Sequence, residues 1–125
     1  MMNGAIENRL HPRLMISLNS QIQPIELKAL VDSGFDGQVA LPYFAADRLQ
    51  LEAVRFAEVT YANGQKAEEI VCRGEILWHS KLRSVEIVLS DDEEPAIGTG
   101  LLQGCVVTMD FIHDTLNIDK PAHGT

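Results

Sequence analysis

The chain has 125 residues, enough for one domain with its own hydrophobic core and too few for two ordinary ones. It carries 10 Lys and Arg against 18 Asp and Glu, a formal net charge of −8. This acidic balance argues against binding to nucleic acid or to anionic membranes, which both select basic surfaces. With 46% hydrophobic residues, the composition is that of a globular domain, which we expect to span residues 1–125 with its core at about 13–119.

The sequence predicts neither a membrane span nor a secretory signal. No apolar run approaches the roughly 18 residues of a spanning helix, and polar residues interrupt positions 1–10, where a signal peptide would be apolar. The two cysteines, Cys72 and Cys105, are too few for a disulfide framework. We therefore expect buried thiols and a cytoplasmic location.

Alternation of apolar and polar residues runs through the first half of the chain and predicts half-buried β-strands. The predicted strands cover residues 13–20, 24–31 and 38–41. Residues 43–51 instead have the spacing of a helix, which we expect to bury Phe44, Ala45 and Leu49.

The second half of the chain predicts three hairpins, which join residues 55–62 to 65–73, 75–78 to 84–89, and 105–112 to 115–119. The turn at Asn63-Gly64 is the strongest of these signals, because both residues tolerate a positive φ. Residues 91–94 predict an acidic turn, and residues 97–103 predict a loop or a helical turn. The whole pattern predicts a small all-β domain with one or two short helices.

Residues 29–37 read Ala-Leu-Val-Asp-Ser-Gly-Phe-Asp-Gly and are the most informative segment of the chain. An apolar strand runs directly into Asp32, Ser33 and Gly34. With Val31 on the core side, Asp32 faces outward at the end of the strand. Gly34 allows a close approach of the backbone, so its N–H can reach the carboxylate. Taken alone, the triplet is more typical of an ordinary Asp-Ser-Gly turn than of a catalytic site.

A second segment shifts the interpretation of this triplet from an ordinary turn towards a catalytic site. Residues 95–102 read Pro-Ala-Ile-Gly-Thr-Gly-Leu-Leu and place an apolar-Gly pair ahead of Leu-Leu. Together, the two segments resemble the retroviral-type aspartic proteases, the single-lobed relatives of pepsin. Those families carry an apolar-Asp-Thr/Ser-Gly strand end, then a flap hairpin, then an apolar-apolar-Gly element before a short Leu-containing helix. The matching pieces here are residues 30–34, the Asn63-Gly64 hairpin and residues 96–102.

The resemblance is strongest to the bacterial branch, whose motif continues as Gly-Phe-x-Gly with a later apolar-Pro step. Residues 34–37 here read Gly-Phe-Asp-Gly, and residues 41–42 read Leu-Pro. The order and spacing agree from about residue 14 to residue 119. The resemblance implies a small closed barrel of the half-pepsin type and the activity of an aspartic endopeptidase.

The catalytic chemistry of this family needs two acids, whereas the chain contains one Asp-Ser/Thr-Gly triplet. The resemblance therefore implies a homodimer in which each subunit supplies one Asp32. Two adjacent carboxylates cannot both ionise, so they share a proton and activate a water that attacks the carbonyl of a peptide or protein substrate. Neither a metal nor an organic cofactor is implied.

The resemblance assigns roles to particular residues. It implies that Asp32 is the catalytic aspartate, that Gly34 donates its N–H to the carboxylate, and that the Ser33 hydroxyl bonds across to the partner subunit. The positions implied to contact, enclose or support substrate are Asp36, Gly37, Tyr61, Ala62, Asn63, Gly64, Ile97 and Gly98, with Ile97 and Gly98 beneath the catalytic loop. Phe35 and Thr99 depart from the viral pattern, which has a small residue and often an Arg at these places. The absent Arg removes an ion-pair partner for the aspartate that follows Phe35.

Two functions stay open on the sequence. One is the homodimeric aspartic endopeptidase, and the other is a non-catalytic homodimeric module on the same fold that binds extended peptide by sheet addition. The intact acid in residues 32–34 favours the enzyme, because a pure binder needs no acid there. Asp110, His113 and Asp114 are more typical of a polar hairpin turn than of a metal site.

Overall fold

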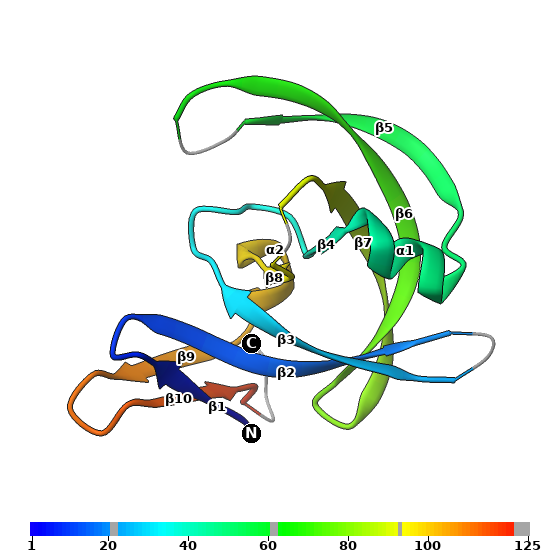
Figure 1. Ribbon diagram of the computed structural model, residues 1–125. Helices are drawn as coiled ribbons and strands as arrows, with labels where there is room; N and C mark the ends of the chain where they lie inside the picture. The colour runs from blue at the N-terminus through cyan, green and yellow to red at the C-terminus, as the bar shows by residue number, and fades with distance from the viewer. Residues whose placement is uncertain (21–22, 61–62, 93, 122–125) are drawn as a thin grey trace.

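The computed structural model describes residues 1–125 except 21–22, 61–62, 93 and 122–125. Its strands are β1 (Met2–Glu7), β2 (His11–Asn19), β3 (Ile25–Val31), β4 (Val39–Pro42), β5 (Ala53–Thr60), β6 (Lys66–Trp78), β7 (Lys81–Ser90), β8 (Ala96–Ile97), β9 (Val106–Asp110) and β10 (Thr115–Asp119). Its helices are α1 (Tyr43–Leu49) and α2 (Thr99–Leu102) (Figure 1). The predicted all-β fold with short helices is confirmed. Among the described residues, no helix is long and apolar enough to cross a membrane.

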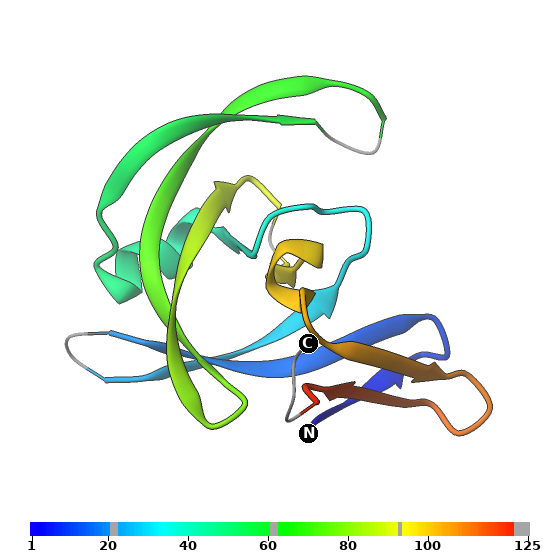
Figure 2. The same cartoon turned by 180° about the vertical axis from the view of Figure 1, so that it is seen from behind.

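Most of the strands close into a ring. The hydrogen-bonded order is β5-β6-β7-β4-β8-β3-β2-β1-β10-β9, and a further pairing of β2 with β6 sets Leu18 opposite Ile76. This pairing joins the two ends of the run from β6 to β2. Outside the ring, β5 continues the sheet beyond β6, and β1, β10 and β9 continue it beyond β2 (Figures 1 and 2).

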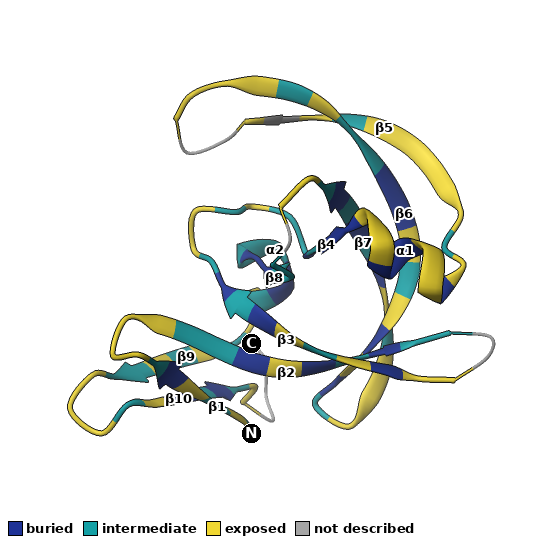
Figure 3. Ribbon diagram, in the orientation of Figure 1, coloured by how far each residue is buried: buried dark blue, intermediate teal, exposed yellow. Residues whose placement is uncertain are grey.

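Apolar side chains from the strands of the ring fill most of the core of the domain. Ile16, Ile76, Ile87 and Ile97 are each 0% exposed and come from β2, β6, β7 and β8. Figure 3 shows buried and more exposed positions alternating along these strands, as the sequence predicts. Burying a side chain of this size contributes about 1.5–3 kcal/mol relative to leaving it in water. The packed ring is therefore a firm support for the loops that its strands carry.

The helix α1 is shorter than the sequence predicts, and one of its three expected core residues is exposed. It ends at Leu49 because Gln50 adopts a left-handed conformation, with φ 54° and ψ 45°. Its buried residues are Ala45, Ala46 and Leu49, whereas Phe44 is 53% exposed. The prediction that Phe44 faces the core is wrong, because each helical residue turns the side chain by about 100° and the two small alanines occupy the inner side.

Two strands also differ from the predicted pattern. β6 runs unbroken through Gly74, where the sequence predicts a break between hairpins. A Cβ at Gly74 would lie 2.7 Å from Cδ1 of Ile87, so this glycine makes room for a side chain of the neighbouring strand and does not form a turn. β1 lies where the sequence predicts no strand. Only Ile6 of β1 is buried, and the strand exists because it pairs with both β2 and β10.

Candidate active site

Asp32 directly follows the last residue of β3 and is half-buried. β3 runs parallel to the short β8, with Val31 opposite Ile97, and the N–H of Asp32 donates to the carbonyl oxygen of Ile97 at 3.0 Å. The chain then turns at once, because the N–H of Phe35 donates to the carbonyl oxygen of Asp32 at 3.2 Å. Both backbone groups of Asp32 are thus satisfied, which holds this residue in place.

Gly34 orients the carboxylate of Asp32. The N–H of Gly34 donates to Oδ1 of Asp32 at 2.9 Å, which is the hydrogen bond that the sequence predicts. A Cβ on residue 34 would lie 3.2 Å from the same oxygen, closer than ordinary van der Waals contact. Oδ2 has no hydrogen-bond partner among the described residues, and Ser33 and Gly34 are exposed. The loop is therefore accessible to a second molecule.

The loop of residues 33–38 rests on the turn between β8 and α2. The N–H of Gly98 donates to the carbonyl oxygen of Gln38 at 3.1 Å, and the N–H of Gly100 donates to that of Gly37 at 3.0 Å. A Cβ on Gly98 would lie 2.5 Å from the Gly37 oxygen, and a Cβ on Gly100 would lie 2.9 Å from it. Glycine is needed at both positions because only a bare backbone can approach the loop this closely.

Thr99 is a support for the loop that the sequence pattern does not reveal. Its N–H and its hydroxyl both lie within hydrogen-bond distance of the carbonyl oxygen of Phe35, at 2.8 and 3.3 Å. The ring of Phe35 covers Gly37, where an added Cβ would lie 2.5 Å from the ring atom Cζ. The sequence points to Thr99 only through a departure from the viral pattern, which often has an Arg at this place. Thr has a hydroxyl that can form a hydrogen bond with the loop.

Ile97 and Gly98 lie beneath the loop and are both buried. Ile97 is 0% exposed and belongs to the hydrophobic core. Neither residue lines the clefts that open beside the loop. Both residues therefore support the loop of Asp32 from below. In the single chain they have no surface that a peptide could contact.

An inner cleft of about 240 Å³ opens beside Asp32. Its apolar walls include Ala40 of β4, Val88 of β7 and Ala96 of β8, and Glu94 also lines it. This volume is just below the roughly 300–1,000 Å³ of pockets that enclose whole small molecules. The inner cleft therefore suits a single amino-acid side chain.

An outer cleft of about 430 Å³ adjoins the inner one and shares with it Phe35, Asp36, Thr60 and Val88. Arg55 and Glu86 line this outer cleft and bind each other, through Nε at 3.1 Å and Nη2 at 2.6 Å. The hydrogen bond from Arg55 lowers the pKa of Glu86. The two clefts together form one continuous groove along the loop.

The hairpin of β5 and β6 forms part of the wall of this groove and contributes Thr60 to both clefts. Its turn has the predicted character, because Gly64 has a φ of +83° and Oδ1 of Asn63 accepts the backbone N–H two residues further on at 2.9 Å. Asn63 and Gly64 are exposed and line neither cleft. Tyr61 and Ala62 lie outside the described residues.

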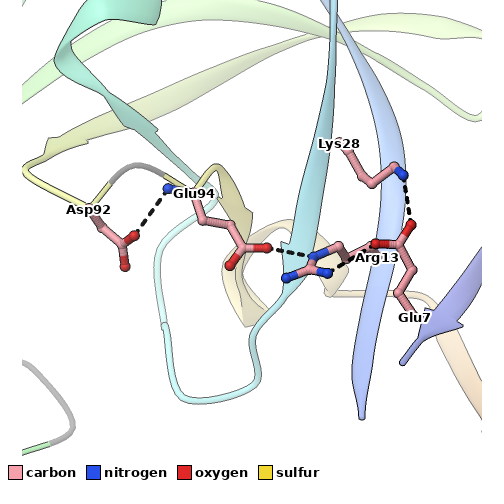
Figure 4. A network of polar contacts seen from close by, with 5 residues as sticks. All are labelled: Glu7, Arg13, Lys28, Asp92 and Glu94. Atoms are coloured by element: carbon pink, nitrogen blue, oxygen red, sulfur yellow. Dashed lines mark hydrogen bonds and ion pairs between the residues drawn. The ribbon is translucent and has the colours of Figure 1, made fainter. Parts of the chain in front are cut away.

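Arg13 links the inner cleft to the neighbouring strands (Figure 4). Its Nε donates to Oε1 of Glu94 at 2.6 Å, and its Nη1 donates to Oε1 of Glu7 at 2.9 Å. Lys28 binds the other oxygen of Glu7 at 2.6 Å. The hydrogen bonds from Lys28 and Arg13 lower the pKa of Glu7, so this carboxylate stays ionised and keeps Arg13 in position.

The residues at the turn between β9 and β10 form a polar turn, as the sequence predicts. Oδ1 of Asp110 accepts the N–H groups of Ile112 and His113 at 2.8 and 3.0 Å, and its Oδ2 lies 2.7 Å from Nδ1 of His113. The hydrogen bonds from the side chain and backbone of His113 lower the pKa of Asp110 to about 2. Among the described residues, no group of three or more His, Cys, Asp or Glu is placed to hold a metal ion.

Comparison with known proteins identifies the fold. The chain matches no protein-family model and no curated protein. Among solved structures, a retropepsin-like aspartic protease from Rickettsia conorii superposes with a TM-score of 0.67 and 18% identity, covering 94% of this chain and 88% of that chain. The EIAV protease in complex with the inhibitor HBY-793 superposes with a TM-score of 0.59 and 19% identity, covering 78% of this chain and 89% of that one. The chain therefore has the fold of the retroviral-type aspartic proteases.

Proposed function

We propose that the protein is an aspartic endopeptidase that hydrolyses peptide bonds as a homodimer, with one Asp32 from each subunit. The observation that carries the proposal is the placement of this residue. Its carboxylate is oriented by the N–H of Gly34 at 2.9 Å, at the end of β3 and beside a cleft. The surrounding chain has the retroviral-type aspartic protease fold.

The proposed dimer supplies the second acid that one chain lacks. A two-fold axis brings the same loop from both subunits together, so each Asp32 faces its symmetry mate. Ser33 and Gly34 are exposed in the single chain, which leaves this part of the loop free to meet a second copy. In the dimer, the Ser33 hydroxyl bonds across to the partner subunit and holds the two loops together.

The proposed reaction uses a water held between the two carboxylates. Because like charges about 3 Å apart cannot both ionise, one carboxyl group keeps a proton and the other acts as a general base. The base takes a proton from the water, whose oxygen attacks the peptide carbonyl. The shared proton stabilises the tetrahedral intermediate, and a proton then passes to the leaving amide nitrogen.

The proposed substrate lies in the groove formed by the two clefts, beneath the hairpin of β5 and β6. Asp36 and Gly37 line this groove next to the catalytic loop and meet the substrate backbone. The tip of the hairpin, with Asn63 and Gly64, closes over the bound peptide as a flap. Ile97 and Gly98 act from beneath the loop.

A non-catalytic peptide-binding module is the second candidate. β5 is at one end of the strand order, so among the described residues its outer edge has no neighbouring strand. An extended peptide can add to such an edge through main-chain hydrogen bonds. This function, on a homodimer of the same fold, requires no acid at position 32.

Cleavage of an unfolded protein mixture distinguishes the two candidates. The protein is incubated with the mixture from acidic to neutral pH, with and without a pepstatin-like inhibitor, and new peptide ends are identified by mass spectrometry. The proposed enzyme produces fragments that the inhibitor suppresses and that are missing with Asp32→Asn. Peptide binding without any cleavage would instead establish the binding module.

We also propose a cytoplasmic location, supported by the two free thiols. Cys72 is buried, as the sequence predicts, and burial raises the pKa of its thiol. The prediction that Cys105 is buried is wrong, because this residue is half-buried with its Sγ 3.9 Å from Nε2 of His79. A reducing compartment keeps such an accessible thiol from oxidising, and cell fractionation tests the location.

A further inference from the structure

The inner cleft combines apolar walls with negative charge. Its four carboxylates belong to Asp32, Asp36, Asp92 and Glu94. Its other walls include the ring of Phe35 and short aliphatic side chains from β4, β7 and β8. No Lys, Arg or His is among the described residues that line it.

Two of these carboxylates are already engaged. Glu94 is bound by Arg13 at 2.6 Å, which offsets its charge (Figure 4). Asp32 accepts the N–H of Gly34 and is reserved for the proposed reaction. These two acids are therefore not available as partners for a charged side chain of the substrate.

The other two carboxylates lack a cation. Asp36 is exposed, and its carboxylate forms no hydrogen bond and no ion pair with any described residue. From the part of the chain that the structure describes, the carboxylate of Asp92 accepts one hydrogen bond, from the backbone N–H of Glu94 at 3.0 Å. Arg55, the cation that lines the outer cleft, is held by two hydrogen bonds to Glu86. The groove thus has negative charge that no cation among the described residues balances.

We propose that the inner cleft accepts a lysine or arginine side chain, so that the protein selects peptides with a basic residue near the bond to be cut. This specificity rests on the proposed function, since it assigns the groove to a peptide. The aliphatic stem of the basic side chain lies along Ala40, Val88 and Ala96, and its charged end reaches Asp36, with Asp92 adding to the attraction. Long cationic side chains bury their stems in this way while the charged end stays near water or a carboxylate.

Phe35 gives the cleft a further preference for cations over neutral side chains. An aromatic face attracts an ammonium or guanidinium group through its negative quadrupole. The ring is half-buried and packed on Gly37, so it is held as a fixed wall beside Asp36. At this place the viral pattern has a small residue, whereas Phe35 adds an aromatic ring that attracts a cation.

The test measures peptide binding without requiring cleavage. The full chain carrying Asp32→Asn is titrated into short, fluorescently labelled apolar peptides, in which one position at a time is Lys, norleucine or Glu. Norleucine keeps the aliphatic stem of lysine and lacks its charge. At the position that enters the inner cleft, we expect the Lys peptide to bind about fivefold more tightly than the norleucine peptide at low salt, as for a solvent-accessible ion pair.

A protein with two substitutions tests whether the tighter binding of the Lys peptide comes from the inner cleft. Adding Asp36→Asn to Asp32→Asn abolishes the difference between the Lys and norleucine peptides, whereas adding Asp47→Asn, on the exposed side of α1, leaves the difference in place. The Glu peptide binds more weakly than both, and high salt reduces the Lys advantage.

Equal dissociation constants for the Lys and norleucine peptides at every position, or an absence of binding, overturn the proposal. A Lys advantage that survives Asp36→Asn overturns it as well. Lysine-selective binding by a protein that cleaves no peptide in its unsubstituted form would support the cleft specificity and refute the proposed endopeptidase. The failures of the two proposals are therefore distinguishable.

Discussion

Among the described residues, Asp32 is positioned by hydrogen bonds to backbone groups alone. Its own N–H is bound to the carbonyl oxygen of Ile97, and its Oδ1 accepts the N–H of Gly34. Backbone groups are rigid, so the carboxylate is oriented before any peptide arrives. Pre-oriented groups stabilise a transition state without the cost of reorganising around it. The proposed chemistry depends on this arrangement and on a second copy of it.

The first prediction concerns the ionisable group at position 32. Asp32→Asn removes it from both subunits at once, so neither the general base nor the shared proton remains. Peptide cleavage should fall by several orders of magnitude, while the fold survives because Asn has the same shape. The parent should show a bell-shaped pH–rate profile, highest where the pair of acids carries one proton.

Ser33→Ala is the matched variant for this prediction. It keeps both acids and removes only the hydroxyl proposed to bond across the dimer, so it should weaken the dimer and leave measurable cleavage at high protein concentration. Cleavage rates and sedimentation of both variants, from acidic to neutral pH, provide the comparison. An Asp32→Asn protein that cleaves as fast as the parent refutes the aspartic-protease mechanism.

The second prediction concerns the pH dependence of stability at Asp110. Its pKa is lowered from 3.8 to about 2 in the folded chain, chiefly by the hydrogen bond from the His113 side chain. A depressed carboxyl pKa contributes stability above the unfolded value, which is lost as the pH falls through the folded value. Asp110→Asn should therefore unfold at lower urea than the parent in mildly acidic solution, and the gap should narrow between pH 3.8 and about 2.

Asp47→Asn serves as the control for this measurement, because Asp47 is exposed on α1 and its carboxylate has no partner among the described residues. It should unfold at the same urea concentration as the parent throughout. A gap for Asp110→Asn that widens as the pH falls would show that the carboxylate does not stabilise the turn.

At the scale of elements, the turn between β8 and α2 fixes the position of the loop of residues 33–38. Gly98 has a φ of −116°, which any residue can adopt, so its backbone conformation does not require glycine. The requirement comes from contact, since a Cβ there would lie 2.4 Å from the carbonyl oxygen of Phe35. That oxygen belongs to the backbone and cannot move without moving the loop.

The third prediction follows from this contact. Gly98→Ala should lower the free energy of unfolding by about 1–3 kcal/mol, as overpacking does in a tight interior, and should reduce cleavage by displacing the loop. Gly74→Ala is the control, because its added Cβ meets the end of the flexible Ile87 side chain at 2.7 Å. Urea unfolding should show a smaller loss for Gly74→Ala, together with retained cleavage. Equal losses in the two variants would contradict the proposed support of the loop.

The elements that sequence predicts well are those with a local signal. Strand alternation identifies β2, β3 and β7, and Asn63-Gly64 identifies the hairpin of β5 and β6, because each pattern lies within a few residues. The strand end at residues 32–34 and the hydrogen bond from Gly34 are predicted for the same reason. The roles proposed for these residues stay predictions until activity is measured.

The elements that sequence predicts poorly depend on distant contacts. β1 has a weak alternation and is held by neighbours on both sides, and Gly74 resembles a break although it only accommodates Ile87. Phe44 has the hydrophobicity of a core residue, but the two alanines of α1 face inward in its place. The bonds from Thr99 to the loop join residues 64 positions apart, which no local pattern reveals.

At the scale of the whole molecule, the ring of strands and the single acid have one joint consequence. The strands from β6 to β2 close into a ring, while Ser33 and Gly34, next to the half-buried Asp32, remain exposed. Each chain supplies one of the two acids that the proposed reaction needs. Assembly therefore controls the proposed activity. A subunit without a partner has an intact fold and an incomplete site, so activity per subunit should fall on dilution below the dissociation constant of the dimer.

The last prediction uses a mixture of subunits to test this dependence. Parent protein is mixed with Asp32→Asn protein, diluted until subunits exchange, and concentrated again before cleavage is measured. A mixed dimer contains one acid and one amide, so it should be inactive. With equal amounts and random pairing, each parent subunit meets another parent about half of the time, so activity per parent subunit should fall to about half, and to about a tenth with a ninefold excess of the variant. In a control, the same excess of Asp32→Asn protein is added in unfolded form, which shows how far added protein lowers activity by competing with the peptide as a substrate. Activity that does not change with the excess of folded variant would mean that one subunit cleaves peptides by itself, and the shared site would be refuted.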